Sequence, residues 1–219
     1  MEKKQLPGEM KSMPPNNDEI IKELIKRVDE LERGIKVIRS QQVFSPLIAG
    51  TNYSVTLNAD SSFNTYTSVV RLEVGALTLP SNSITMMRIT MAASSVKPLV
   101  ITNSFIGHAA TVGNSYDFLS TPVQLFWSGS ASITIPIGGT ALSDWAVFSY
   151  NKTNALSIAT YTNGGAALDG VRYRLGLGAN VNNYYKVATN EAGTVIKSAG
   201  YSTAAGQNVC IAKVESNGF

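Results

Sequence analysis

The 219-residue chain is predicted to be mainly β, with an N-terminal α-helical coiled-coil stalk followed by an antiparallel, jelly-roll-like β-sandwich head. Three observations predict this fold class: a heptad pattern over residues 16–42, a sharp drop in charged residues after residue 43, and an alternating apolar pattern from residue 44. The predicted divisions are a flexible tail over residues 1–15, the stalk over 16–43 and the head over 44–219.

The first 15 residues are polar and contain three prolines and three lysines. A segment of this composition buries too little apolar surface to fold alone, so we expect an extended or disordered tail. A tail ahead of a coiled coil is typical of the docking peptide of a fibre. The alternative is a terminus without a binding role.

The stalk is predicted from an uninterrupted alternation of heptad positions a and d. Pro14 and Pro15 exclude an earlier helix start, and Asn16 with Glu19 forms a capping-box pattern. Opposite charges four residues apart, such as Glu23 and Arg27, add weak support. The apolar seam that would hold the chains together consists of Ile21, Leu24, Val28, Leu31, Ile35 and Ile38.

The seam predicts an oligomer, because a lone helix with a bare apolar stripe is marginal in water. Ile or Val at a with Leu at d favours two strands, whereas the Ile35–Ile38 heptad favours a higher number. Ile20 and Ile25 widen the apolar face beyond a two-stranded seam, so we favour a homotrimer over a dimer. The alternative is an amphipathic helix that packs onto its own head.

The head is predicted from its low charge and its short alternating segments. Of the 33 charged residues in the chain, 17 lie in the first 43 positions. Apolar and polar residues alternate around Val69–Val74 and Ile133–Ile137, as in half-buried strands. The segments predicted as strands are 52–60, 67–80, 83–93, 97–105, 122–139, 144–151, 155–164, 171–178 and 194–200, while 166–171 and 201–219 are ambiguous.

Composition also bears on partners and location. The net charge of +3 is small and no basic stripe carries interleaved aromatic residues, so we expect no nucleic-acid binding. The single cysteine, Cys210, allows no intrachain disulfide and is expected to be a buried apolar residue. No signal peptide and no run of 18 apolar residues is present, so synthesis in the cytoplasm without membrane insertion is expected.

Residues 84–161 of the head resemble the non-catalytic β-sandwich module that accompanies some GDSL-type (SGNH) esterases. The module has a strand that ends in a turn, followed by a Pro-Gly loop and a Ser-Asp pair. The matching positions are Ile101, Asn103, Ser104, Phe105, Gly107, Ile133, Ile135, Pro136, Gly138, Gly139, Ser143, Asp144, Leu156, Ser157, Ile158 and Tyr161. The Gly-Asp-Ser and Asp-x-x-His blocks of the esterase are absent, so the resemblance implies the sandwich fold without the activity.

The sequence offers no catalytic residues, and we expect the protein not to be an enzyme. A Ser-His-Asp site would have to use His108, the only histidine, and no GxSxG or GDS motif supplies the serine. His108 is predicted to be a turn residue. One histidine and one cysteine cannot form a zinc site, and no cofactor is expected. A calcium site built from Asp and Asn oxygens, or a carboxylate pair in a cleft, stays open.

Binding of a glycan is the more plausible chemistry, because aromatic faces and neutral hydrogen-bonding groups hold sugars. Tyr184 and Tyr185 follow two asparagines, and since neighbours on a strand point to opposite faces, at least one is expected to be exposed. The segment 180–186 is therefore predicted as a contact loop. Trp127 and Trp145 are further candidate glycan contacts, with a core position as the favoured alternative for both.

A tail, a coiled coil and a β head in this order are similar to bacteriophage head fibres and short tail fibres. That resemblance implies a virion protein whose tail docks on a capsid or tail protein and whose heads meet a bacterial surface glycan. The alternatives are a purely structural capsid-decorating protein and a carbohydrate-binding accessory domain of an extracellular enzyme.

Overall fold

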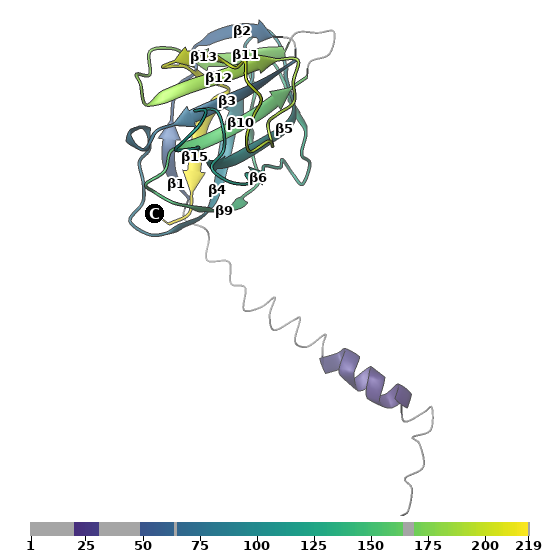
Figure 1. Ribbon diagram of the computed structural model, residues 1–219. Coiled ribbons are helices and arrows are strands. Elements are labelled where there is room, and N and C mark those ends of the chain that lie inside the picture. Colours follow the sequence, from purple (N-terminus) through teal and green to yellow (C-terminus); the bar gives the residue numbers. More distant parts are fainter. Residues whose placement is uncertain (1–19, 31–48, 64, 164–168, 219) are drawn as a thin grey trace, which may run out of the picture. The chain divides into compact units, whose positions relative to one another are not determined.

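The computed structural model describes residues 20–30, 49–63, 65–163 and 169–218. The chain forms two compact units, Met1–Pro46 and Leu47–Phe219. In the described residues of the first unit the backbone is helical, and those of the second form sheets (Figure 1). No helix in these described ranges has the length and hydrophobicity needed to cross a bilayer.

Residues 20–30 form an α-helix, as the heptad pattern predicts. The Arg27 guanidinium lies 3.6 Å from the Glu23 carboxylate, which is one of the predicted i,i+4 pairs. The apolar side chains of this helix are about half exposed in the single chain: Ile20, Ile21, Leu24, Ile25 and Val28. The remaining predicted seam residues, Leu31, Ile35 and Ile38, lie outside the described residues, as does the tail over residues 1–15.

The described strands of the second unit form three antiparallel sheets. The five-stranded sheet has the order β1-β15-β4-β8, with β9 also paired with β4. Its strands are β1 (Gly50–Ser54), β4 (Ile84–Ala92), β8 (Thr140–Leu142), β9 (Ala146–Tyr150) and β15 (Ile211–Ser216).

The seven-stranded sheet has the order β13-β12-β3-β10-β5-β6, with β7 also paired with β5. Its strands are β3 (Tyr66–Leu72), β5 (Leu99–His108), β6 (Val123–Gln124), β7 (Ile133–Ile135), β10 (Leu156–Thr162), β12 (Val181–Val187) and β13 (Ser202–Ala205). The three-stranded sheet has the order β14-β11-β2, with β2 (Ala59–Phe63), β11 (Asp169–Arg174) and β14 (Asn208–Val209). A 3-10 turn, η1, spans Val74–Ala76.

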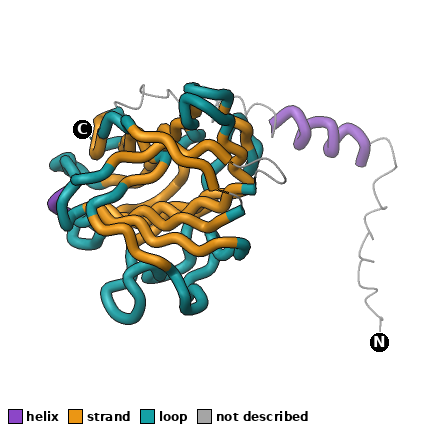
Figure 2. The backbone as a smooth tube through the Cα atoms, turned by 90° about the horizontal axis from the view of Figure 1, so that it is seen from above, coloured by secondary structure: helices purple, strands orange, loops and turns teal. Residues whose placement is uncertain are grey.

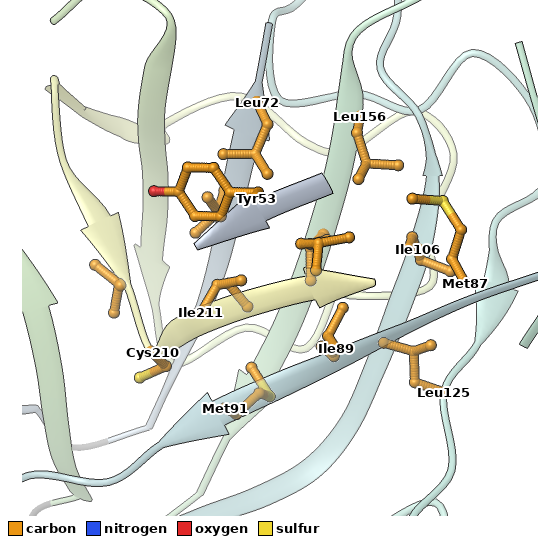
Figure 3. Close-up of a cluster of buried hydrophobic side chains, with 14 of the residues drawn as sticks. Tyr53, Leu72, Met87, Ile89, Met91, Ile106, Leu125, Leu156, Cys210 and Ile211 are labelled. Carbon is orange, nitrogen blue, oxygen red and sulfur yellow. The ribbon is translucent and has the colours of Figure 1, made fainter. Parts of the chain in front are cut away.

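The two larger sheets share one hydrophobic core, and the strands lie in layers around it (Figure 2). Figure 3 shows Met87, Ile89 and Met91 of β4 with Ile211 of β15 on one side of this core. Leu72, Leu156 and Ile106, from β3, β10 and β5, face them from the other side, and Cys210 is buried beside Ile211, as the sequence predicts. Burial of these alternating residues is what holds the layers together.

The outer face of the seven-stranded sheet is also covered, by a second apolar cluster. Val69 of β3 and Ala159 of β10 are buried beneath Phe118 and Ala192, which belong to long loops. Tyr116, Tyr184 and Tyr201 pack around them. The central strands β3 and β10 are therefore buried on both faces, which explains their nearly continuous apolar pattern.

Two of the predicted segments were wrong. Residues 194–200 form bends and irregular backbone instead of a strand, and Lys197 is buried there with its ammonium donating to the Thr194 carbonyl at 2.8 Å. The predicted contact loop 180–186 is instead part of an inner strand, β12, which lies between β13 and β3. The ambiguous stretch 201–219 contains β13, β14 and β15.

Candidate functional site: a tyrosine-lined cleft

The two predicted tryptophan contacts lie in different surroundings. Trp127 is 4% exposed and belongs to the main core, so the alternative core position holds for this residue and its ring is not offered to a ligand. Trp145 is half-buried, and the Arg88 guanidinium lies 4.5 Å from its ring centroid. Because a cation already covers one face of that ring, Trp145 is a poor sugar platform.

Tyr184 and Tyr185 point to opposite faces of β12, as their spacing predicts, but neither is fully exposed. Tyr184 joins the outer apolar cluster, with its ring centroid 5.9 Å from that of Tyr116. Tyr185 packs against the main core and lines a cleft. The expectation that one ring is exposed was wrong, because loops cover the outer face of this sheet.

The cleft lies where β12, β13 and β3 approach the three-stranded sheet, in the region where Figure 1 labels β2, β11, β12 and β13. Its volume is about 210 Å³. Three tyrosine rings from three different strands line it, together with small apolar and neutral polar side chains. The lining residues are Ser61, Tyr66, Val171, Tyr173, Leu175, Asn183, Tyr185, Ala204, Gln207 and Val209.

Strand pairing explains why these residues meet. Tyr173 and Val171 are two residues apart on β11 and therefore point to the same face. Tyr173 is paired with Val209 on β14 and with Ala59 on β2. Asn183 is opposite Ala204 on β13 and Val70 on β3, on the same face as Tyr185. The strand faces that carry these residues therefore line one cleft beside the main core, against which Tyr173 and Tyr185 pack.

No charged side chain lines this cleft within the described residues. On β11 the alternation turns Arg172 away from it, toward Asp60, whose carboxylate lies 3.9 Å from the guanidinium. That carboxylate also accepts a hydrogen bond from the Ser95 amide at 3.2 Å. The nearby charges thus neutralise each other, and the cleft suits an uncharged ligand.

Polar groups in the cleft have capacity for a ligand. The Ser68 hydroxyl donates to Oδ1 of Asn183 at 2.6 Å, which fixes the orientation of that buried amide. Among the described residues, no hydrogen bond is found from Nδ2 of Asn183, from the side chain of Gln207 or from the hydroxyl of Tyr173. Aromatic faces with neutral donors and acceptors are the combination that a polyhydroxylated ligand requires.

His108 is the last residue of β5 and not a turn residue, because β5 continues through the predicted turn. Its Nε2 accepts the Asn151 backbone N–H at 2.8 Å, and its ring stacks on Tyr150 with centroids 5.4 Å apart. Burial lowers the pKa of this imidazole below its ordinary value. The nitrogen that would serve as a base is thus occupied by the backbone.

The described residues contain no group of three or more His, Cys, Asp or Glu side chains placed to hold a metal ion.

No model of a known protein family matches the chain, and no curated protein matches it. The resemblance of residues 84–161 to the esterase-associated module therefore stays a prediction.

Sequence reasoning found Tyr185 but missed the other residues of the cleft. Alternation in the stretch around Val171 and Tyr173 places both side chains on one face of a strand. It does not show that this face meets β12, which is distant in the chain. Asn183 gave a misleading signal, because asparagine is rare inside strands and pairs of it are typical of loops.

Proposed function

We propose that this protein is a non-enzymatic virion fibre, in which a trimeric coiled coil presents jelly-roll-like β-sandwich heads for attachment to a host cell-surface glycan. The tail over residues 1–15 would dock on a capsid or tail protein, and the protein would reach the cell surface as part of the particle.

The observation that carries the glycan proposal is the uncharged cleft with its three tyrosines. Tyr173 and Tyr185 are partly buried side chains that line the cleft, and Asn183 and Gln207 line it with neutral hydrogen-bonding groups. A cleft of about 210 Å³ is smaller than the roughly 300–1,000 Å³ of typical sites for drug-sized ligands, so each head would hold one small unit.

Weak binding by each head is compatible with attachment if several heads act together. The half-exposed apolar stripe of the helix over residues 20–30 supports association through the stalk. Once one head is bound, the others reach neighbouring sugars as an intramolecular event, and avidity rises without new contacts. A repeated surface polymer is the ligand that such an assembly fits.

The test is binding of the intact protein to host cells and to their purified neutral polysaccharides, measured by pull-down and by calorimetry. We expect Tyr185→Ala to weaken binding by about tenfold per head or more, equivalent to about 1.4 kcal/mol. Tyr184→Ala is the matched control, because this neighbour lies on the opposite face of the same strand. Equal losses for both variants, or no glycan binding by the wild type, would contradict the proposal.

An exposed apolar surface favours a second candidate, the purely structural capsid-decorating protein. Val112, Leu119 and Ile196 are exposed around a shallow depression on the loops that cover the seven-stranded sheet. Exposed apolar groups gathered in this way are typical of protein contacts. Loss of capsid binding, with unchanged cell binding, in Val112→Ser and Ile196→Ser variants would favour this function.

A further inference from the structure

The floor of the cleft differs from its rim. Tyr66, Val171 and Val209 are buried at the floor, so apart from the Tyr66 hydroxyl the floor consists of an aromatic ring and two valines. Two of the lining residues that the structure describes bring buried polar atoms to this region: Asn183, which is 3% exposed, and Tyr66, whose hydroxyl is also buried. A ligand group that reaches the two valines must therefore be apolar on that side and direct its polar atom toward Asn183.

The orientation of Asn183 determines which ligand atom it can accept as a partner. Because Ser68 donates to Oδ1, the amide nitrogen is the end of the side chain that remains for a ligand. An amide nitrogen donates, so the ligand must present an acceptor such as a carbonyl oxygen.

A plain sugar hydroxyl fits this floor poorly. It would place an O–H donor against Val171 and Val209, and a buried donor without an acceptor costs about 1–3 kcal/mol. An acetamido substituent avoids the cost, because its carbonyl accepts from Asn183 while its methyl group lies against the valines. The sugar ring then remains at the rim, beside Tyr173 and Gln207.

We propose that the cleft selects a 2-acetamido sugar, with the acetamido group on the floor formed by Tyr66, Val171, Val209 and Asn183. This inference rests on the proposed glycan-binding function and names the sugar class that the site takes. It requires no metal and no covalent step.

The first test uses the wild-type protein and two probes, the methyl glycosides of N-acetylglucosamine and of glucose. Titration followed by NMR gives both dissociation constants, and we expect the acetamido sugar to bind at least tenfold more tightly. Equal affinities would overturn the acetamido inference while leaving a glycan-binding head. Absence of binding by both probes and by whole-cell polysaccharide would overturn the inference and the proposed function together.

The second test uses Asn183→Asp, which keeps an oxygen to accept from Ser68 and removes the amide donor. We expect the preference for the acetamido probe to fall at least tenfold. Asn182→Asp is the control, because Asn182 lies on the other face of β12 and donates to the Ala179 carbonyl at 3.0 Å. Retained preference in a folded Asn183→Asp variant, checked by circular dichroism, would contradict the assignment of Asn183.

Discussion

Asp144 holds a tight hairpin turn through two hydrogen bonds to backbone amides. Its Oδ1 accepts from the Ser128 N–H at 3.1 Å, and its Oδ2 accepts from the Gly129 N–H at 2.8 Å. Ser128 and Gly129 have φ values of 51° and 78°, so both adopt the left-handed region that a two-residue hairpin turn requires. The carboxylate thus offsets an unfavourable backbone conformation at Ser128.

We expect Asp144→Ala to lower the free energy of unfolding by about 1–2 kcal/mol, because two amides lose a charged acceptor. Urea unfolding at neutral pH measures this. Asp144→Asn keeps one acceptor oxygen, so its free energy of unfolding should lie between those of the wild type and of Asp144→Ala. An unchanged midpoint for the alanine variant would show that solvent replaces the carboxylate without cost.

His108 makes stability depend on pH. Its lowered pKa means that the unfolded chain takes up a proton more readily than the folded chain. The stabilising contribution of the neutral imidazole is therefore present above the unfolded pKa of about 6.5, and it is lost as the pH falls below that value. We expect the urea midpoint to decline as the pH is lowered from 7.5 to 5.5.

His108→Gln is the control for this dependence. Its amide oxygen can accept from Asn151 without titrating, so its midpoint should be flat over the same range. Glu215 does not contribute to the change in stability between pH 7.5 and 5.5. Burial raises its pKa, but the hydrogen bonds and charges of Lys213 and Arg88 lower it below 4.5 overall, so its contribution is lost only in more acidic solution. Parallel slopes for wild type and variant would contradict the assignment to His108.

At the scale of elements, Gly170 sets how closely β11 approaches the loop before β5. Its N–H donates to the Pro98 carbonyl at 2.9 Å, and its carbonyl accepts from the Ser94 N–H at 3.1 Å. A Cβ at this position would lie 2.4 Å from the Lys97 carbonyl oxygen. The backbone itself is in the way, so the contact cannot be relieved by a rotamer change.

We expect Gly170→Ala to destabilise the head by about 2–3 kcal/mol, measured by thermal or urea unfolding. Gly176→Ala is the comparison, because there a Cβ would meet open space and only the left-handed backbone, φ 74°, opposes it. That variant should cost about 1 kcal/mol. A smaller loss for Gly170→Ala than for Gly176→Ala would show that β11 can move away from Lys97.

The sequence predicts well those strands in which buried apolar residues either alternate with polar ones or follow one another without a break. Such strands include Val69–Leu72 in β3 and residues 84–92 in β4. Their apolar side chains pack between the layers, so the burial pattern is visible in the sequence. β12 was missed because its inner face is lined by Asn183 and Tyr185, which suit a polar cleft more than a core. Residues 194–200 were mistaken for a strand because Val195 and Ile196 alternate with polar residues in a loop.

The cleft could not be predicted from the sequence, because its residues come from strands that are distant in the chain. Tyr66, Tyr173 and Tyr185 come from three strands, and their meeting depends on the pairing of β11 with β2 and of β12 with β3. Such long-range pairings carry no local signal. The tyrosines are recognisable one at a time as residues of half-buried strands, but not as members of one site.

At the scale of the whole molecule, we expect the helix to determine the number of chains that associate. For a homotrimer we expect a molar mass of about 70 kDa, three times the 23.4 kDa of one chain, by light scattering coupled to size exclusion. Replacing Leu24 and Val28 by Glu places charges in the seam and should yield monomers. Lys22→Ala, on the polar face of the helix, is the control and should leave the mass unchanged.

A chain that begins at Val43 separates the stalk from the head in the same measurement. Monomers near the mass of the shortened chain would agree with association through the stalk alone. Trimers of the shortened chain would place an interface in the head as well. A monomeric intact chain would favour the alternative of a helix that packs onto its own head, and it would contradict the fibre proposal.

In the stretch Asn182-Asn183-Tyr184-Tyr185 of β12, the pair Asn182 and Tyr184 repeats the pair Asn183 and Tyr185 one position earlier. A slip of the strand by one position would put Asn182 and Tyr184 where Asn183 and Tyr185 now line the cleft, so the residues that face the cleft cannot define the alignment alone. Residues outside the cleft must do so: the same slip would exchange the buried Val181 for Asn180 and would remove Tyr184 from the outer apolar cluster. Val181 and Tyr184, neither of which lines the cleft, thus determine which of the two tyrosines does.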